Sequence, residues 1–248
     1  MRDFTYNGVT LSSFGGRILQ KPSHTVARRN IDRVKIYGQS GDEIIDNESY
    51  DNVDFSLKVC FLPHLTAYSA QELSQRVINW LAPLQNSYYV YRDTYNPGYF
   101  TKAVLTNFDE VVRELLTLLT ATLKFTRVPF WYADSGSTSV TFTDQGYFVN
   151  PEIYPSEPIF DLVYTGDLID ITLRLLVGDK AIDVPMGSSA LLSHQILDGV
   201  AKQHYHVDNG AKIYISDLLP PDLQPGSNII SLSHSAVTCT LTPNWRRL

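Results

Sequence analysis

The sequence has 248 residues and a formal net charge of −6, and its 44% hydrophobic and 19% charged residues are ordinary for a soluble globular protein and exclude disorder. Its apolar runs are too short to cross a bilayer and the N-terminus lacks the apolar segment of a secretory signal, so no membrane insertion is expected. Cys60 and Cys239 give neither a disulfide framework nor a metal-ligand spacing, which fits assembly in a reducing cytoplasm.

Charge divides the sequence into two parts. Residues 1–131 hold 14 Lys and Arg against 13 Asp and Glu, a net +1, whereas residues 132–248 hold 6 against 13, a net −7, and the two sum to −6. Proline is also more frequent in the second part. We therefore predict two domains, 1–131 and 132–248. The acidic balance excludes a general nucleic-acid binder, which needs a basic surface.

Strand and turn patterns dominate the first part. Residues 4–11 predict a hairpin around an Asn-Gly turn. The one expected helix begins at a capping box of Ser69 and Glu72, and Trp80 lies on its apolar stripe as a core residue. The stretch 117–132 closes the first domain as a long half-buried strand, because apolar side chains alternate with polar ones at Leu119, Ala121, Leu123 and Phe125.

A long hairpin with uneven charge is expected between residues 28 and 59. Its rising arm is basic, the following tip is acidic as far as Asp54, and the strand 53–59 returns from it. The opposite charges can pair across the two strands of one hairpin, bind the hairpin of a neighbouring copy, or stay solvated. The residues predicted to form a subunit interface are Arg28, Arg29, Arg33, Lys35, Asp42, Glu43, Asp46 and Glu48.

The second part reads as a β-sandwich. Short strands separated by turn residues fill residues 140–241, and this spacing is typical of two packed antiparallel sheets. In the final strand, Val237, Cys239 and Leu241 are expected to face inward. The whole chain is therefore predicted to be mainly β.

Three residues that can bind a metal, His204, His206 and Asp208, fall on alternate positions of one expected strand. A metal-dependent hydrolase centred on the two histidines is one hypothesis, with His194 as the only plausible fourth ligand. The simpler interpretation is a pair of exposed strand histidines, since Asp208 opens an Asp-Asn-Gly turn where its side chain has a conformational role. We expect no metal and no cofactor.

Other chemical signals have simple structural explanations. Asp161, Asp167 and Asp170 can be imagined as a glycosidase carboxylate pair, but acids in loops and at strand edges of an acidic domain explain them equally. Neither a nucleophile elbow nor a phosphate loop is present, so no catalytic residue is predicted. Aromatic residues that can stack on sugars, but that we expect to pack at the domain boundary, are Phe130, Trp131 and Trp245.

Three stretches of the sequence carry a family resemblance. The first is the opening FTYNG at 4–8 with Phe14-Gly15. The second is the middle of the chain, where the hairpin 33–54, the helix end NWL at 79–81 and the strand FTRVPF at 125–130 follow in this order. The third is the ending 219–246 with its Pro-Gly-x-Asn and Pro-x-Trp-Arg motifs. In this order they resemble the distal tail proteins (Dit) of long-tailed bacteriophages, over essentially the whole chain.

The resemblance implies an N-terminal tail-tube-like β-sandwich or split barrel, with one helix and a long hairpin, and a galectin-like C-terminal β-sandwich. It also implies a structural, non-enzymatic protein of the virion. Six copies would form a ring, single or as two rings back to back, that joins the tail tube to the tip or baseplate. DNA would pass through the central channel without specific binding.

The resemblance further implies the tail tube protein, a tail-tip protein and receptor-binding or baseplate proteins as partners. The alternative function is a carbohydrate-binding module that recognises host surface glycans through the C-terminal sandwich. A chain of 248 residues leaves no room for the sugar-binding insertion that some members of the family carry.

Overall fold

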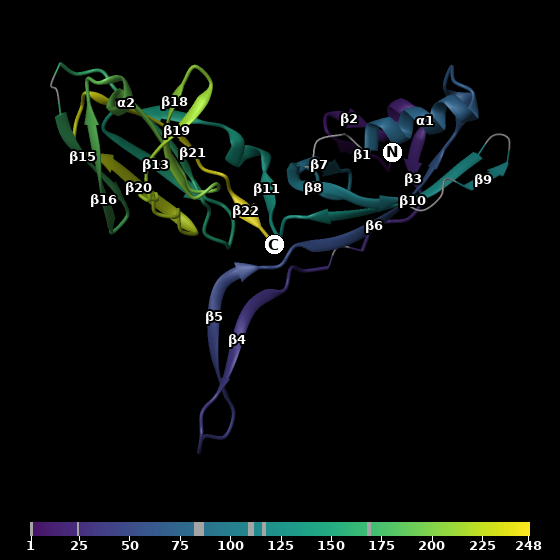
Figure 1. Cartoon of the computed structure of the whole chain (residues 1–248), viewed down its shortest axis with the longest axis horizontal. Coiled ribbons are helices and arrows are strands. Elements are labelled where there is room, and N and C mark those ends of the chain that lie inside the picture. Colours follow the sequence, from purple (N-terminus) through teal and green to yellow (C-terminus); the bar gives the residue numbers. More distant parts are fainter. Residues whose placement is uncertain (1, 24, 82–86, 109–111, 116–117, 168–169) are drawn as a thin grey trace. The chain divides into compact units, whose positions relative to one another are not determined.

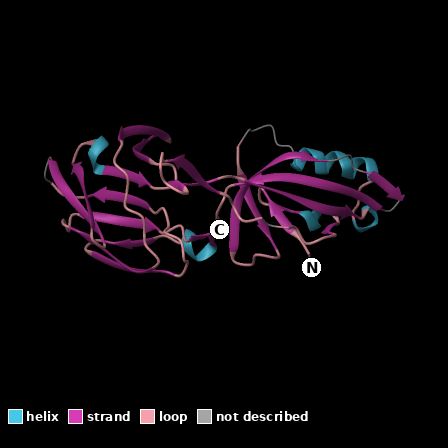
Figure 2. Ribbon diagram, turned by 90° about the horizontal axis from the view of Figure 1, so that it is seen from below, coloured by secondary structure: helices cyan, strands magenta, loops and turns pink. Residues whose placement is uncertain are grey.

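The computed structural model describes residues 2–23, 25–81, 87–108, 112–115, 118–167 and 170–248 (Figures 1 and 2). The chain forms two compact units, unit 1 (Met1–Trp131, with Leu248) and unit 2 (Tyr132–Arg247). Strands paired in antiparallel sheets dominate both units, so the predicted mainly β class is confirmed. Among the described residues, no helix has the length and apolar character needed to cross a membrane.

Unit 1 consists of a main sheet, a helix packed on it and a separate hairpin. The main sheet has the strand order β2-β1-β7-β8-β10-β6-β3, and β9 pairs with β10. The helix is α1 (Ala70–Leu81). The strands are β1 (Phe4–Tyr6), β2 (Val9–Thr10), β3 (Gly16–Ile18), β6 (Val53–Phe61), β7 (Tyr89–Asp93), β8 (Tyr99–Phe108), β9 (Val112–Leu115) and β10 (Leu118–Arg127).

Strand β10 confirms the alternation predicted for the stretch 117–132, of which residue 117 lies outside the described part. It pairs antiparallel with β6 from Leu119 opposite Phe61 to Arg127 opposite Val53. The predicted core positions at 119, 121, 123 and 125 are all buried. Strand β10 therefore supplies the centre of the apolar core of unit 1.

Helix α1 begins at the predicted capping box. The backbone N–H of Ser69 donates to Glu72 Oε2 at 2.9 Å, and the N–H of Glu72 donates back to Ser69 Oγ at 3.3 Å. Trp80 is buried as expected, and its indole Nε1 donates to the carbonyl of Tyr6 at 2.9 Å. The hydrogen bond ties the last turn of α1 to β1 and satisfies the one polar atom of the indole.

The hairpin differs from the sequence prediction. Its two strands are β4 (Arg29–Lys35) and β5 (Asp42–Tyr50), which form a sheet of their own that projects from the main sheet of unit 1 (Figure 1). The segment 53–59 is not the returning arm, because the apolar residues of β6 are buried against the core. The acidic residues between 42 and 48 consequently lie along the second strand and not at a tip.

Unit 2 contains two antiparallel sheets whose inward-facing residues are mostly apolar, including the predicted Val237, Cys239 and Leu241. The six-stranded sheet has the order β12-β21-β14-β17-β18-β19 and the four-stranded sheet the order β13-β20-β15-β16. The strands of the first are β12 (Val140–Phe142), β14 (Ile159–Tyr164), β17 (His194–Asp198), β18 (Gln203–Asp208), β19 (Ala211–Ser216) and β21 (Val237–Thr242). Those of the second are β13 (Gln145–Asn150), β15 (Asp170–Val177), β16 (Lys180–Gly187) and β20 (Gly226–Leu232).

The described part of the chain also contains short elements, among them the 3-10 turns Leu11–Phe14, Pro63–Leu65 and Asp134–Ser137 and three further elements. These three are the helical turn α2 (Ala190–Ser193) and the strands β11 (Trp131–Ala133) and β22 (Arg246–Arg247), which pair with each other.

Candidate assembly surface

The β4–β5 hairpin is exposed along almost its whole length. One ion pair joins its strands near their base: Arg29 Nε donates to Asp46 Oδ1 at 2.9 Å, and Arg29 Nη2 contacts Asp46 Oδ2. The hydrogen bond from Arg29 holds the pKa of Asp46 below its usual value. Arg29 and Asp46 were both expected at a subunit interface, but within one copy they already pair with each other.

Two further side-chain hydrogen bonds join the strands in the same half of the hairpin. Asn30 Nδ2 donates to Ser49 Oγ at 3.1 Å, and Asn47 Nδ2 donates to Asp32 Oδ2 at 3.1 Å. A register shift between residues 29 and 31 lies opposite Glu48, whose φ of 50° is left-handed. The base of the hairpin is therefore held by local contacts within one copy.

The outer half of the hairpin is different. In the described part of the chain, Arg33, Lys35, Asp42 and Glu43 form no ion pair, although Lys35 lies opposite Asp42 in the register. Among the described residues, Arg28 has no ionic partner either, and the side chain of Glu48 makes no contact. Large apolar side chains are exposed between these charges, namely Val34, Ile36, Tyr37, Ile44 and Ile45. An isolated two-stranded hairpin is marginally stable in water. With its exposed apolar side chains and unpaired charges, this half is the candidate assembly surface.

A buried arginine anchors the root of the hairpin. Arg127, at the end of β10, is 1% exposed, and its Nη1 donates to the carbonyls of Val128 at 2.9 Å and Pro129 at 2.7 Å. Its Nη2 donates to the carbonyl of Thr25, which precedes β4, at 3.3 Å. Burial lowers the pKa of Arg127 to about 10, which leaves the guanidinium protonated at neutral pH.

The predicted metal candidates are not arranged as a metal site. His204 is fully buried, and both of its ring nitrogens have partners: Nδ1 lies 2.8 Å from Ser216 Oγ and Nε2 lies 2.6 Å from Gln195 Oε1. His206 Nδ1 donates to the backbone carbonyl of His194 at 2.7 Å, whereas Asp208 is exposed at the end of β18. The expectation of exposed strand histidines was therefore wrong, since the two histidines pack inside unit 2. Among the described residues, no group of three His, Cys, Asp or Glu side chains converges as metal ligands.

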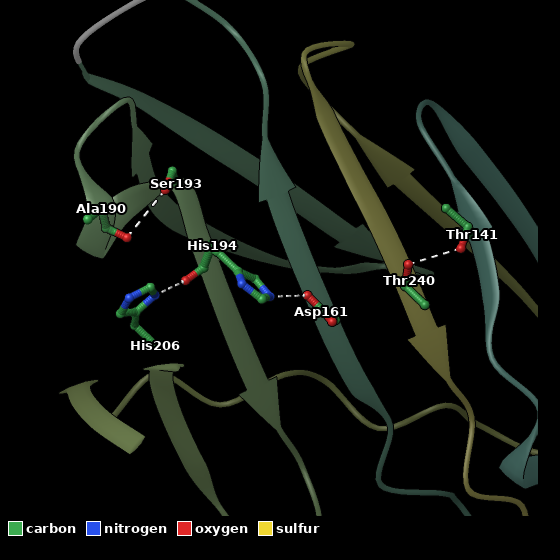
Figure 3. A network of polar contacts seen from close by, with 7 residues as sticks. All are labelled: Thr141, Asp161, Ala190, Ser193, His194, His206 and Thr240. Carbon is green, nitrogen blue, oxygen red and sulfur yellow. Dashed lines mark hydrogen bonds and ion pairs between the residues drawn. The ribbon is translucent and has the colours of Figure 1, made fainter. Parts of the chain in front are cut away.

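His194, the expected fourth ligand, contacts Asp161 instead, with Nε2 2.7 Å from Oδ1 (Figure 3). Thr141 and Thr240 share a hydrogen bond of 3.0 Å in the same sheet. Asp161 lies on β14 of the six-stranded sheet, Asp170 opens β15 of the four-stranded sheet, and Asp167 lies in the loop between them. The two strand carboxylates thus belong to different sheets, which does not favour the glycosidase interpretation.

The aromatic residues around the predicted domain boundary are buried. Trp131 is 3% exposed and lies in the core of unit 1 with its ring 5.4 Å from the Arg127 guanidinium, and Phe130 packs edge-on against Tyr50 at 5.5 Å. Trp245 is 6% exposed within unit 2. Neither tryptophan offers a free ring face on which a sugar can stack.

Comparisons with solved structures identify the fold. Neither a family model nor a curated protein sequence matches the chain. The crystal structure of the Dit protein of phage SPP1, described as a paradigm of the hub adsorption apparatus in phages that infect Gram-positive hosts, is similar with a TM-score of 0.69. The two chains are 14% identical, and each is covered completely. The chain has the fold of a Dit protein.

Two structures of the phage P2 baseplate in its activated conformation are also similar to this Dit fold. The structure with calcium has a TM-score of 0.53 at 9% identity, and the structure with strontium has a TM-score of 0.52 at 8% identity. Each match covers 100% of this chain and 98% of the baseplate chain. The predicted resemblance is confirmed for the fold.

The Pro-x-Trp-Arg ending of this Dit fold has a structural role that the sequence did not reveal. Asn244 adopts a left-handed φ of 55°, and its backbone N–H donates to the carbonyl of Gly136 at 2.8 Å. Arg246 Nε donates to the carbonyl of Pro155 at 2.7 Å, and its Nη1 forms an ion pair with Glu157. The ending therefore fastens the last residues of unit 2 to segments more than 85 residues earlier in the chain.

Proposed function

We propose that this protein is a structural hub of a phage tail, without catalytic activity. The observation that carries the proposal is the match of the whole chain to the SPP1 Dit protein, in which both units are included. A match at 14% sequence identity shows the fold alone, so the function is proposed by analogy with that fold, and the exposed hairpin supports it.

In the proposed assembly, six copies form a ring through their N-terminal units, as one ring or two rings back to back. A head-to-tail contact that closes on itself uses two different surfaces of each copy, and the outer half of the β4–β5 hairpin is one of them. Its unpaired bases and acids, with apolar side chains between them, fit a contact that is both charged and apolar.

The ring joins the tail tube to the tip or baseplate in the virion and leaves a central channel for DNA. Six copies carry a net charge of six times −6, or −36, which favours DNA passage without specific binding. The partners are the tail tube protein, a tail-tip protein and receptor-binding or baseplate proteins. In this proposal unit 2 is the galectin-like domain implied by the resemblance, and it contacts the receptor-binding or baseplate proteins.

Native mass spectrometry of the purified full chain tests the ring directly. One copy has a mass of 28.0 kDa, so six copies give six times 28.0, or 168 kDa, and two rings give twice that mass. A species of either mass supports the hub. A protein that stays monomeric or dimeric from micromolar to near-millimolar concentration contradicts a self-assembling ring.

A further inference from the structure

The four-stranded sheet of unit 2 has an open edge at β13. This strand lies first in the order β13-β20-β15-β16. In the described part of the chain, its backbone from Gln145 to Asn150 pairs with β20 alone. Because alternate residues of a strand direct their N–H and C=O groups to opposite sides, every second residue of β13 points these groups away from the sheet.

The other three sheet edges of unit 2 carry features that discourage further pairing. Strand β12 is only three residues long. Strand β16 contains Pro185 and begins with Lys180, and β19 carries Lys212 and pairs with β18 through a register shift. Proline, lysine, short length and irregular register are the usual protections of an edge strand. Strand β13 is six residues long and has neither a charged residue nor a proline.

The solvent face beside this edge is apolar. Tyr147 is 72% exposed and Val149 is 66% exposed on β13, and Ile229 on β20 is 46% exposed directly opposite Tyr147. Aromatic and β-branched side chains favour strand pairing, and exposed tyrosine is common where proteins meet. The open edge and the apolar face can therefore bind the same ligand, an extended chain that pairs with β13 and places its side chains beside these three residues.

The charges beside β13 distinguish two candidate ligands of this edge, a second copy of the chain and an extended segment of another protein. Acidic residues flank the strand on both sides, Asp144 before it and Glu152 after it. If two copies paired antiparallel through β13, Asp144 of each copy would approach Glu152 of the other, and facing like charges destabilise a strand pair. A segment with basic residues at both ends meets attraction at the same two places.

We propose that β13 binds an extended segment of another protein as a fifth strand of this sheet. The segment has apolar side chains at alternate positions, which lie beside Tyr147 and Val149, and Lys or Arg at its ends, which face Asp144 and Glu152. The backbone pairing provides affinity and the alternating side chains provide selectivity. In the proposed hub the segment belongs to another tail protein. That assignment rests on the proposed function, whereas the binding site itself does not.

Fluorescence anisotropy of a labelled peptide with the full chain tests the site. The probe has alternating valine and threonine between terminal lysines. We expect saturable binding that weakens about tenfold or more in the double variant Tyr147→Lys, Val149→Lys. Tyr214→Lys, which changes an exposed tyrosine on the edge strand β19, is the matched control and keeps the affinity. Because all three side chains are exposed, the variants keep the fold, which circular dichroism checks.

Two further probes show how the peptide binds. A peptide with every second amide N-methylated cannot pair along the edge and should not bind, and a peptide with terminal glutamates should bind more weakly. Absence of saturable binding, or equal binding of the N-methylated peptide, overturns the proposal. A concentration-dependent dimer that the Tyr147 and Val149 substitutions abolish also overturns it, in favour of a second copy as the occupant. The variants should leave the hexamer mass unchanged, so the result is independent of ring formation.

Discussion

Arg127 Nη2 donates to the carbonyl oxygen of Thr25 at 3.3 Å, across 102 residues of sequence. The contact joins the end of the central strand β10 to the segment that enters the hairpin. Nη1 of the same guanidinium binds the carbonyls of Val128 and Pro129. One side chain therefore holds the segment that follows β10 next to the segment that precedes β4. The position of the proposed assembly surface in unit 1 thus depends on a residue that is itself fully buried.

Replacing this anchor should destabilise unit 1. Arg127→Met keeps much of the apolar volume but removes three hydrogen bonds from a charged donor, and we expect a loss of about 3 kcal/mol in the free energy of unfolding. Urea unfolding of the full chain, with hydrogen exchange along β6 and β10, measures the effect. Lys58→Met, a change of an exposed residue on β6, is the control. Equal unfolding midpoints for the two variants would show that Arg127 is not an anchor.

Reversing the free charges of the hairpin should weaken the ring. In the double variant Arg33→Glu, Lys35→Glu, the monomer should fold normally because both side chains are exposed and unpaired. Sedimentation velocity should show a shift from hexamer to smaller species, and the shift should be largest at low salt. Arg174→Glu on β15 of unit 2 is the control. An unchanged distribution of species would remove this part of the hairpin from the interface.

Unit 2 should lose stability as the pH falls through the range of His204. Burial lowers the pKa of His204, so the unfolded chain takes up the proton first. The stabilisation is complete above the unfolded pKa of about 6.5 and decreases as the pH falls from there toward the folded pKa, by at most about 1.4 kcal/mol per pH unit. Urea midpoints between pH 7.5 and 5 measure this slope. His204→Gln should reduce the slope, and a slope equal to that of the wild type would contradict the assignment.

The close packing of the C-terminal ending on Gly136 should leave no space for a side chain at residue 136. A Cβ added to Gly136 would lie 2.3 Å from the backbone nitrogen of Trp245 and 2.9 Å from its Cβ. We expect Gly136→Ala to cost about 1 to 3 kcal/mol through displacement of the ending. Thermal unfolding compares it with Ser137→Ala at the exposed neighbouring position. If both variants have the same melting temperature, the packing of Trp245 on Gly136 does not contribute to stability.

Local patterns predicted the individual elements well. The alternation in β10, the Ser69 and Glu72 cap and the buried position of Trp80 were all readable, because each depends on residues that are neighbours in sequence. The strand that pairs with β6 could not be predicted in this way. The alternation in β6 correctly predicts a strand, but β6 pairs with β10, whose residues lie 58 (119 − 61) to 74 (127 − 53) positions later, and local patterns do not indicate a partner at that distance.

The candidate site was predicted less completely than the fold. The charged hairpin was expected, yet the pairing of β4 with β5 contains a register shift opposite Glu48, which has no clear sequence signal. The ring nitrogens of the buried His204 are hydrogen-bonded to Gln195 and Ser216 on neighbouring strands. The spacing of the histidines in the sequence could not predict these partners. The anchor Arg127 had one usable signal, its position at the end of the strand, two residues before Pro129.

The most direct test of the account is negative-stain electron microscopy of the purified full chain. The hub function predicts particles with six-fold rotational symmetry and a central hole, and it predicts that the Arg33→Glu, Lys35→Glu variant loses them. Rings of another symmetry, or particles without a hole at every concentration, would contradict the hub.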